Sequence, residues 1–553
     1  MVRSVFPDLP IPQTDVLSYA LGDNISKDPI WIDAEDPSRA LSLHDLRSWV
    51  RRLAISLKRH QLQHGDVVLV FTPNHIFVPV AYFGVTSYGA VFTGANPAYT
   101  VGELSNLMRD TGAKLVLLHP SLAETAIKSA KEVGLPLECL MLFSDRPVQP
   151  VRGLVDWFSI LPPETECECG QLAPFDSSAS KTRAASLNYS SGTTGLPKGV
   201  YVSHHALIAN SEQIIFMRDY GKPYSARNRP EERWVGFLPL YHAYGQVYNI
   251  LMAAKLRTKV FVMKTFNYER FLWVVQTYKI THLQIAPPIM IMLNKRPETE
   301  KYDLSSVIDV LCGAAPLSMA LQNEVTKKFG FTIRQGWGMT EVTCGGLNMP
   351  ADLCSQTGSV GMLHPNSFCK LVDDMGNEVG PGERGELYYK GPNVALGYWR
   401  NPAATKEAFS DDGWLKTGDI AVMDHKGMVW IVDRKKELIK VSGLQVAPAE
   451  LEAILLQHDD IADAAVVGIT SGEEEFPRAY VVLKDMNPEH RPTERSIQSW
   501  VEERVAKHKR LQGGVAFVKE IPKLASGKIQ RKTMREWAKQ DAKLLATNIK
   551  HRL

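Results

Sequence analysis

Residues 189–199 read Tyr-Ser-Ser-Gly-Thr-Thr-Gly-Leu-Pro-Lys-Gly, a run of hydroxyl side chains and glycines with a single lysine. The flanking residues 183–189 and 200–205 are partly apolar, as in buried strands, so the run connects two strands. Glycine permits positive φ angles and close approach of a ligand, the hydroxyls can donate to phosphate oxygens, and lysine supplies a positive charge. The run therefore predicts a triphosphate-binding loop formed by Ser190, Ser191, Gly192, Thr193, Thr194, Gly195 and Lys198.

This loop differs from a Walker A motif, which has serine or threonine after its lysine at the start of a helix. Here Pro197 precedes the lysine and Gly199 follows it. A flexible Gly/Ser/Thr surface loop is the alternative interpretation. The motifs found far downstream favour the binding loop, because a flexible linker would not be accompanied by further motifs in a fixed order.

The composition is that of an ordinary globular protein, 44% hydrophobic and 22% charged, and 553 residues are too many for a single core. The net charge of +3 gives no indication of nucleic-acid binding. The seven cysteines contain no Cys-x-x-Cys pair, which favours reduced intracellular thiols over a zinc site. His60 and His64 are spaced for a metal but lie at a polar helix end, which favours a solvated surface.

No apolar run reaches the ~18 to 20 residues of a membrane helix, and prolines and an acid among residues 1–10 exclude a signal-peptide core. The last three residues, His551-Arg552-Leu553, resemble the peroxisomal Ser-Lys-Leu signal in the basic residue and the leucine. Two locations stay open. Either an import receptor takes the protein into peroxisomes, or the protein is cytoplasmic and the tripeptide is a coincidence.

Apolar periodicity predicts an α/β fold. Helical spacing over 41–62, 77–90 and 123–132 alternates with strand-like runs at 66–71, 115–118 and 139–143, which is typical of mostly parallel sheets covered by helices. Beyond about residue 355, Gly-rich turns separate short strands, as in a hairpin at 369–378 and a small barrel-like part. A small α+β domain follows, with helices at 448–457 and 496–508, strands at 461–469 and 478–483, and a flexible end after Trp537. The predicted domains are 1–433 and 434–553.

Four further stretches accompany the loop in a fixed order. They are Gln335-Gly-Trp-Gly-Met-Thr-Glu341, Gly413-Trp-Leu-Lys-Thr-Gly-Asp-Ile420, residues 433–445, and Pro522-Lys-Leu-Ala-Ser-Gly-Lys-Ile-Gln-Arg531. Together the five resemble the acyl-adenylate-forming (AMP-binding) superfamily, which includes acyl-CoA synthetases, firefly luciferase and peptide-synthetase adenylation domains. Residues 238–245, Leu-Pro-Leu-Tyr-His-Ala-Tyr-Gly, and 446–450, Val-Ala-Pro-Ala-Glu, are most similar to the 4-coumarate:CoA ligase and luciferase branch.

The resemblance implies an enzyme that uses ATP, Mg²⁺ and CoA. A carboxylate attacks the α-phosphorus of ATP, pyrophosphate leaves, and the acyl-AMP then forms a thioester. Glu341 is the implied magnesium ligand, Thr340 reaches the α-phosphate, and Asp419 and Arg434 bind the ribose and phosphate. Trp337 would cover the adenine where relatives have tyrosine. Besides these and the loop, the implied ATP-binding residues are Gly313, Ala314, Ala315, Pro316, Gln335, Gly336, Gly338, Met339 and Lys528.

The resemblance also assigns the two half-reactions to opposite faces of the small domain. Lys528 serves adenylation, whereas Lys440, Gly443 and Gln445 serve transfer to CoA, after a rotation about a hinge at Lys436. His242 gates the approach of the substrate carboxylate. The implied catalytic residues are therefore Lys528, Lys440, His242 and Thr340.

The implied acyl pocket is lined by His242, Tyr244, Gly313, Gly336, Gly338, Val342 and Cys344. The sequence after Glu341, Val-Thr-Cys-Gly-Gly, departs from the plant 4-coumarate ligases, and the expected substrate is an aryl, cinnamoyl or medium-to-long aliphatic acid. No evident charged partner for an amino acid's ammonium lies among these residues. The alternatives are an acyl-AMP ligase serving a separate carrier protein, a luciferase-like oxygenase, and a non-catalytic nucleotide-binding homologue.

Overall fold

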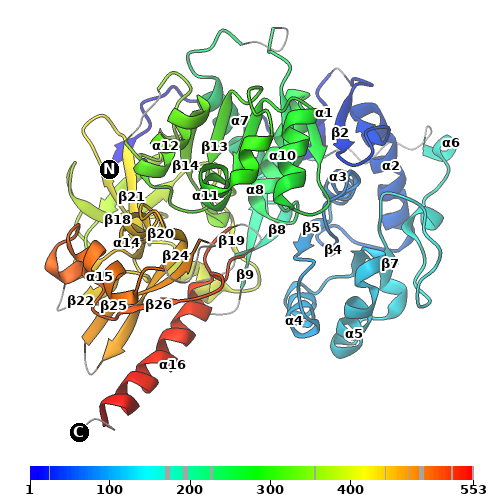
Figure 1. Cartoon of the computed structure of the whole chain (residues 1–553). Helices are drawn as coiled ribbons and strands as arrows, with labels where there is room; N and C mark the ends of the chain where they lie inside the picture. The colour runs from blue at the N-terminus through cyan, green and yellow to red at the C-terminus, as the bar shows by residue number, and fades with distance from the viewer. Residues whose placement is uncertain are drawn as a thin grey trace.

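The computed structural model describes residues 1–23, 25–167, 175–190, 197–224, 228–353, 357–441, 444–471, 474–484, 491–524 and 527–550. Residues 191–196 of the predicted phosphate loop, Gly443 and the C-terminal tripeptide lie outside this range. Two sheets covered by helices and a third, antiparallel sheet form the large part of the molecule, and a small α+β unit packs beside them (Figure 1). The predicted α/β class is confirmed.

A seven-stranded sheet carries the predicted loop at its edge. The strand order is β19 (Gly397–Tyr398), β9 (Lys198–Ser203), β8 (Ala184–Ser190), β5 (Val91–Ala95), β4 (Val67–Phe71), β6 (Leu115–Leu118) and β7 (Leu140–Leu142). Neighbours from β8 to β7 are parallel, and β8 and β9 form an antiparallel hairpin whose last pair is Ser190 and Lys198. The residues on both sides of the loop are therefore strands, as the sequence predicts.

The helices of this sheet follow the predicted periodicity. They are α2 (Leu43–Arg59), α3 (Val78–Tyr88), α4 (Val101–Thr111) and α5 (Ala123–Val133). Helix α2 starts at a capping box, in which the Ser42 side chain accepts from the Asp45 backbone and Asp45 accepts from the Ser42 backbone. Its apolar residues then repeat on one face, which is buried in the core.

A nine-stranded sheet lies alongside. Its order is β16 (Met362–Leu363), β15 (Leu347–Asn348), β14 (Thr332–Trp337), β13 (Asp309–Cys312), β12 (His282–Ile285), β10 (Arg233–Gly236), β11 (Lys259–Val262), β2 (Pro29–Asp33) and β3 (Ala40–Ser42). The strands from β14 to β2 are parallel, and the outer strands are antiparallel. The carboxyl ends of β12, β13 and β14 thus open on one edge, where ligands of α/β sheets bind.

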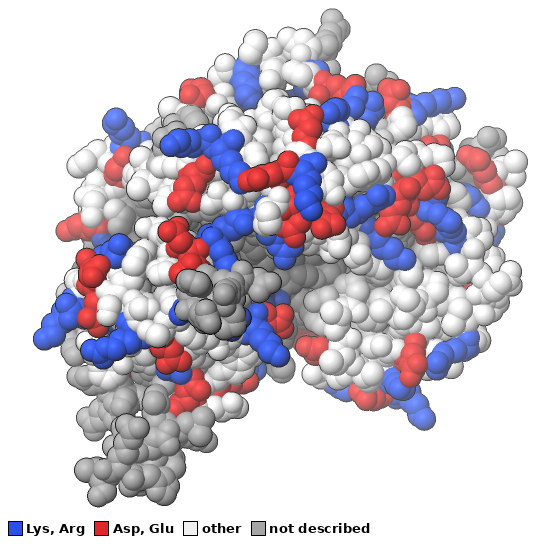
Figure 2. All heavy atoms as spheres, in the orientation of Figure 1, with Lys and Arg blue, Asp and Glu red and all other residues white. Residues whose placement is uncertain are grey.

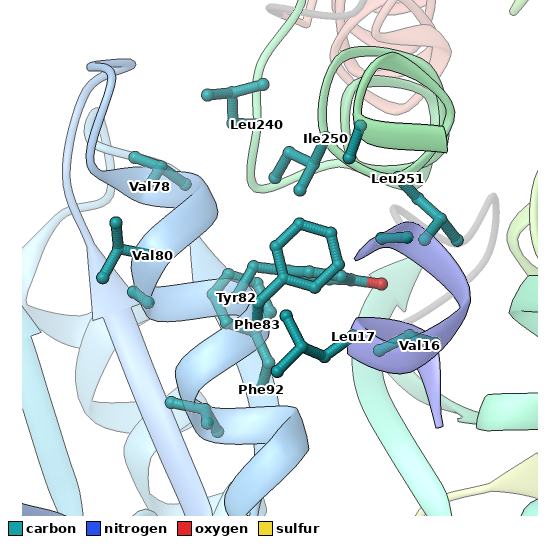
Figure 3. Packing of buried hydrophobic residues seen from close by; sticks show 14 of the residues in the cluster. Val16, Leu17, Val78, Val80, Tyr82, Phe83, Phe92, Leu240, Ile250 and Leu251 are labelled. Atoms are coloured by element: carbon teal, nitrogen blue, oxygen red, sulfur yellow. The ribbon is translucent and has the colours of Figure 1, made fainter. Parts of the chain in front are cut away.

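One hydrophobic cluster joins the two sheets. Figure 3 shows Tyr82 and Phe83 of α3 facing Leu17 of α1 (Val16–Leu21) and Ile250 of η5, a π-helical segment (Gln246–Met252). The same cluster includes strand residues of both sheets, such as Phe92 on β5 and Trp234 on β10. Because a close-packed interior resists deformation, this cluster fixes the position of one sheet relative to the other.

The third sheet is antiparallel and follows the Gly-rich region. Its order is β1 (Val2–Arg3), β17 (Phe368–Val372), β18 (Arg384–Lys390), β20 (Leu415–Met423) and β21 (Val429–Arg434). In the predicted hairpin region, Asp373 accepts from the backbone of Met375 and Asn377, and Val372 bridges to Glu378. Strands β20 and β21 place Asp419 and Arg434 opposite each other in register.

The small unit comprises β22 (Ile439–Val441), β23 (Leu444–Val446), α14 (Pro448–Leu455), β24 (Ile461–Ser471), β25 (Glu474–Leu483), α15 (Glu494–Glu502), β26 (Val515–Phe517) and α16 (Arg531–Lys550). The helix expected at 496–508 ends at Glu502, and residues 507–509 form a separate 3₁₀ turn. The reason is packing. Leu511 and Val515 enter the same buried cluster as Ile497 and Val501, so the chain must turn back after the helix.

The end of the chain is a second difference between the sequence prediction and the structure, because the sequence predicts a flexible segment after Trp537. Helix α16 continues to Lys550 and ends the described chain away from the rest of the small unit (Figure 1). The Trp537 ring lies 5.6 Å from that of Tyr480, and Asp541 accepts from Arg478 and from the Tyr480 hydroxyl, each at 2.8 Å. Buried Met534 and Ala538 provide the apolar contact that polarity alone did not predict.

The described residues include no helix that is both long and apolar enough to cross a membrane. In the same part of the chain, Cys139, Cys312, Cys344 and Cys369 are free thiols. Figure 2 shows lysines and arginines interspersed with acidic side chains over the viewed face, without a single basic patch.

Candidate active site

A cavity of about 60 Å³ lies where β13 and β14 end and the small unit meets the large one. The turn after β13 gives Ala314 a left-handed φ of +72°, and the turn after β14 leads through Gly338 into the 3₁₀ turn Thr340–Val342. The walls come from four segments of the large domain and one residue of the small unit. They are His242, Ala243, Tyr244, Tyr248, Leu311, Gly313, Ala314, Gly336, Trp337, Gly338, Met339, Thr340, Cys344, Gly345, Asn348 and Lys528.

Most of the predicted acyl and nucleotide residues therefore meet at one place. Others do not line the cavity. The Gln335 amide donates to Leu317 and Gln322, Val342 is buried in the core under the third sheet, and Ser190, Lys198, Asp419 and Arg434 lie outside the cavity walls. Ala315 is half-buried and Pro316 exposed, both outside the cavity walls. Sequence reasoning missed Tyr248, Leu311, Gly345 and Asn348.

Only some of the missed residues left a signal in the sequence. Tyr248 follows Tyr244 by four residues, the spacing of neighbours on a helix, and their ring centroids are 5.0 Å apart. Asn348 lies opposite Gly336 through the pairing of β14 and β15, which depends on topology. No local sequence pattern predicts the pairing of β14 with β15.

His242 caps a short helix, α8 (Ala243–Gly245), and its Nδ1 accepts from the Tyr244 backbone at 3.3 Å. That bond leaves the proton on Nε2. Burial, and secondarily the charge of Lys528, lowers the pKa of His242 to about 3. The imidazole is thus neutral at physiological pH and can donate one hydrogen bond from Nε2.

Asp419 is buried on β20, and its carboxylate contacts residues of β14 and β21. Its Oδ2 accepts from the indole N–H of Trp337 at 2.8 Å, and its Oδ1 lies 3.1 Å from Nε of Arg434. Trp337 is 7% exposed, packed in the core of the third sheet and also part of the cavity wall. Each carboxylate oxygen has a second lone pair, so Asp419 can still accept from a ribose hydroxyl.

Asp419→Ala is expected to weaken ATP binding by about 1.5 to 3 kcal/mol, the usual loss for hydrogen bonds to a charged acceptor. Calorimetric titration with ATP measures the change. Asp411→Ala, at an exposed turn before β20, is the matched control and should bind ATP as the wild type does. An unchanged affinity of the Asp419 variant, with a normal melting temperature, would remove this residue from the nucleotide site.

Glu341 lies beside the ends of the phosphate loop. It is buried, its Oε1 accepts from the Tyr398 hydroxyl at 2.7 Å, and Nζ of Lys198 lies 5.0 Å from the centre of the Tyr398 ring. Burial and this carboxylate raise the pKa of Tyr398. A hard carboxylate oxygen next to bound phosphates is a ligand set that suits Mg²⁺, so the residues present fit this ion.

Lys528 is a half-buried residue that the small unit contributes to the cavity wall. Burial and Arg434 lower the pKa of Lys528, and Asp419 and Glu341 oppose this effect. The preceding Gly527 has a φ of +83°, and a Cβ there would be 3.1 Å from Ala286 and Pro288. The chain thus passes close to the start of α11 (Pro287–Lys295) with little room for a side chain.

Two of the residues implied in thioester formation, Lys440 and Gln445, lie away from the cavity. Lys440 is exposed on β22, and its backbone N–H donates to Glu475. Gln445 donates to Asp374 at 3.4 Å, and neither residue lines the cavity. The structure therefore has the Lys528 face of the small unit turned toward the cavity.

Two lysines hold the small unit in this position. Nζ of Lys295, at the end of α11, donates to the backbone carbonyls of Leu456 at 2.8 Å and Ile461 at 2.5 Å. Lys435, next to the implied hinge at Lys436, forms ion pairs with Asp374 and Glu386, each at 3.0 Å. Burial lowers the pKa of Lys295 to about 8.

Comparison with known proteins agrees with this geometry. The family model described as AMP-binding enzyme matches residues 24–399, and the AMP-binding enzyme C-terminal domain matches residues 450–528. An acyl-CoA synthetase of Alternaria alternata, ACTT5, is 37% identical and aligned over 93% of this chain and 88% of its own. The phenylacetyl-CoA ligase epaB of Aspergillus niger is 36% identical over 97% and 98%.

A solved structure extends the similarity to the whole fold. ATP-bound MatB from Rhodopseudomonas palustris superposes with a TM-score of 0.80 at 27% identity, covering 96% of this chain and 100% of that one. The family models span both the strands that carry the cavity and the unit that carries Lys528. The chain belongs to the AMP-binding enzyme family.

Proposed function

We propose that this protein is an acid:CoA ligase that forms an acyl-AMP from ATP and a carboxylic acid and then transfers the acyl group to CoA. One observation carries the proposal. Lys528 of the small unit lines the same cavity as His242 and Thr340 and lies within electrostatic reach of Asp419 and Arg434. A cation beside an apolar pocket and a ribose-type acceptor suits a reaction that joins a carboxylate to a nucleotide.

In the first half-reaction a substrate carboxylate oxygen bonds to the α-phosphorus of ATP, and the bond to pyrophosphate breaks. Lys528 and the Nε2–H of His242 stabilise the negative charge at the carboxylate, and Thr340 donates to the α-phosphate. Asp419 positions the ribose. Mg²⁺ bound by Glu341 and the phosphates would supply further positive charge.

In the second half-reaction the CoA thiol attacks the acyl carbonyl, AMP leaves, and the thiol proton is lost. Because Lys440 is remote from the cavity in the present arrangement, this step requires residues 434–553 to rotate about Lys436. The walls formed by Tyr244, Tyr248 and Leu311 suit an aryl or aliphatic acyl group.

Pyrophosphate release with a panel of carboxylic acids, with and without CoA, tests the proposal. The expected result is acid-dependent pyrophosphate release together with a CoA thioester detected by mass spectrometry. Acyl-AMP without thioester would favour delivery to a separate carrier protein, light or oxygen consumption would favour an oxygenase, and no release with any acid would favour a non-catalytic homologue.

We further propose that His551-Arg552-Leu553 directs the protein to peroxisomes. The support is the basic residue followed by a terminal leucine, which an import receptor can bind through the leucine side chain and the free carboxylate. A fluorescent protein carrying the last ten residues is expected to collect in peroxisomes, and deleting Leu553 should return it to the cytosol. Diffuse fluorescence of both fusions would make the protein cytoplasmic.

A further inference from the structure

A second cavity, of about 40 Å³, lies deeper in the large domain. It is called the distal cavity here. Tyr248, Leu311 and Asn348 line both cavities, so the two share a wall. Helix α7 (His204–Asp219) contributes Ile214 and Arg218 to the distal cavity.

The register of the sheet shows that the two cavities lie along one face. Leu311 on β13 pairs with Gln284 on β12 and with Arg334 on β14. All three line the distal cavity. Gly313 and Gly336, which line the first cavity, lie two residues further along β13 and β14, and strand side chains two apart point to the same face. An acyl group that extends from Lys528 along this face therefore heads for the distal cavity.

Two residues that line the distal cavity have buried polar atoms without protein partners. Among the described residues, Nη1 of Arg218 and Oε1 of Gln284 are buried without a hydrogen bond. The Arg218 side chain is only 15% exposed. A buried donor without a partner is costly, which indicates that a ligand group or water satisfies it.

Arg218 belongs to a network of ion pairs with little exposure to solvent. Arg218 pairs with Glu232 at 2.6 Å, Arg334 pairs with Asp309, and Arg229 pairs with Asp219 and Glu232. Lys222 and Asp352 adjoin this network, and the Asp352 side chain lies against Gly221. Burial together with Arg334 and Arg218 lowers the pKa of Lys222. His282 adds no charge, since burial lowers its pKa to about 3.

We infer that the acid substrate carries a second carboxylate at its far end, and that Arg218 binds this group in the distal cavity. The inference rests on the proposed function and names its substrate class: dicarboxylic acids with an apolar middle. The second carboxylate accepts from Nη1 of Arg218. The amide of Gln284 turns its NH₂ toward this group, since rotation of an amide by half a turn exchanges its donor and acceptor.

Matched pairs of acids test the inference on the wild-type enzyme. A series of unbranched diacids from adipate to sebacate, and 4-carboxycinnamate, are each compared with the monoacid of the same length. The expected result is that at the fitting length kcat/KM for pyrophosphate release is about tenfold or more higher for the diacid, because the monoacid leaves Nη1 of Arg218 without a hydrogen bond. Activation of monoacids with no diacid preferred at any length overturns the inference and leaves the proposed ligase function intact. No release with any acid refutes both.

Substitutions of Arg218 test whether this residue binds the second carboxylate. Arg218→Met is expected to lower the diacid-to-monoacid ratio of kcat/KM by about tenfold, and Arg218→Lys, which keeps the charge for Glu232, to lower it less. Arg229→Met is the matched control, since Arg229 shares the same acidic partners but does not line the distal cavity, and it should leave the ratio within about threefold of wild type. If Arg218→Met and Arg229→Met shift the ratio equally, the distal cavity is not the binding site. If neither Arg218 variant folds, the wild-type series decides.

Discussion

Lys528→Ala is expected to lower acyl-AMP formation by about 10²- to 10³-fold, the usual loss when one preorganised charge-stabilising group is removed. The ammonium lies in the cavity wall, among Arg434, Asp419 and Glu341, where no other lysine of the described residues lines the cavity. Pyrophosphate release from ATP and free acid measures the step. Thioester formation from pre-made acyl-AMP and CoA should stay near the wild-type rate, since that step uses the opposite face of the small unit.

Two further lysines make this result specific. Lys440→Ala should show the reverse pattern, with normal pyrophosphate release, slow thioester formation and accumulated acyl-AMP. Lys523→Ala removes a lysine of the same segment that pairs with Asp463 at 2.5 Å, and it should leave both steps intact. Equal losses of both steps in the Lys528 variant would falsify the division of labour between the two faces.

Gly338→Ala is expected to destabilise the protein and abolish its activity. A Cβ at this position would lie 1.7 Å from the carbonyl oxygen and 2.7 Å from the carbonyl carbon of Cys344. That segment cannot yield easily, because Asn210 bonds to both the N–H and the carbonyl of Gly345, and Asn393 also donates to this carbonyl. We expect a loss of about 3 kcal/mol in the free energy of unfolding, the upper part of the range for overpacking, measured by urea denaturation.

Gly313→Ala is the matched control on the neighbouring strand. Its added Cβ would be 3.9 Å from the nearest atoms, which belong to Gly336 and Tyr244. This variant should fold with near-normal stability and activate small acids. A Gly338 variant as stable and active as the Gly313 variant would show that the turn after β14 is more adaptable than its packing indicates.

The sequence predicted the parts of the molecule that local patterns determine. Alternating periodicity gave the helices and parallel strands of the first sheet, and the spacing of hydroxyls, glycines and Lys198 placed a loop between β8 and β9. Five ordered motifs indicated the family. The family resemblance implied the cavity walls at Gly313, Gly336 and Thr340. The structure brings them together because they lie at the ends of neighbouring parallel strands.

The rest depends on contacts between distant segments. Tyr398, whose hydroxyl donates to Glu341, belongs to no motif and arrives through the edge strand β19. Arg218 and Arg334 are far apart in the sequence and meet only because α7 and β14 contribute to the same cavity. The extent of α16 was missed because its anchor is the pairing of Asp541 with Arg478 on another element. Local polarity carries no information about such pairs.

The contact of Lys295 with the small unit couples domain rotation to proton binding. Docked on two carbonyls, this lysine has a pKa near 8, whereas in water it would return toward its ordinary 10.5. The docked form therefore binds a proton more weakly than the rotated form, and rising pH between these values favours docking. The lowered pKa of Lys528 acts in the same direction. With the proposed rotation, each turnover at alkaline pH would take up protons as the small unit leaves the cavity and release them as it returns.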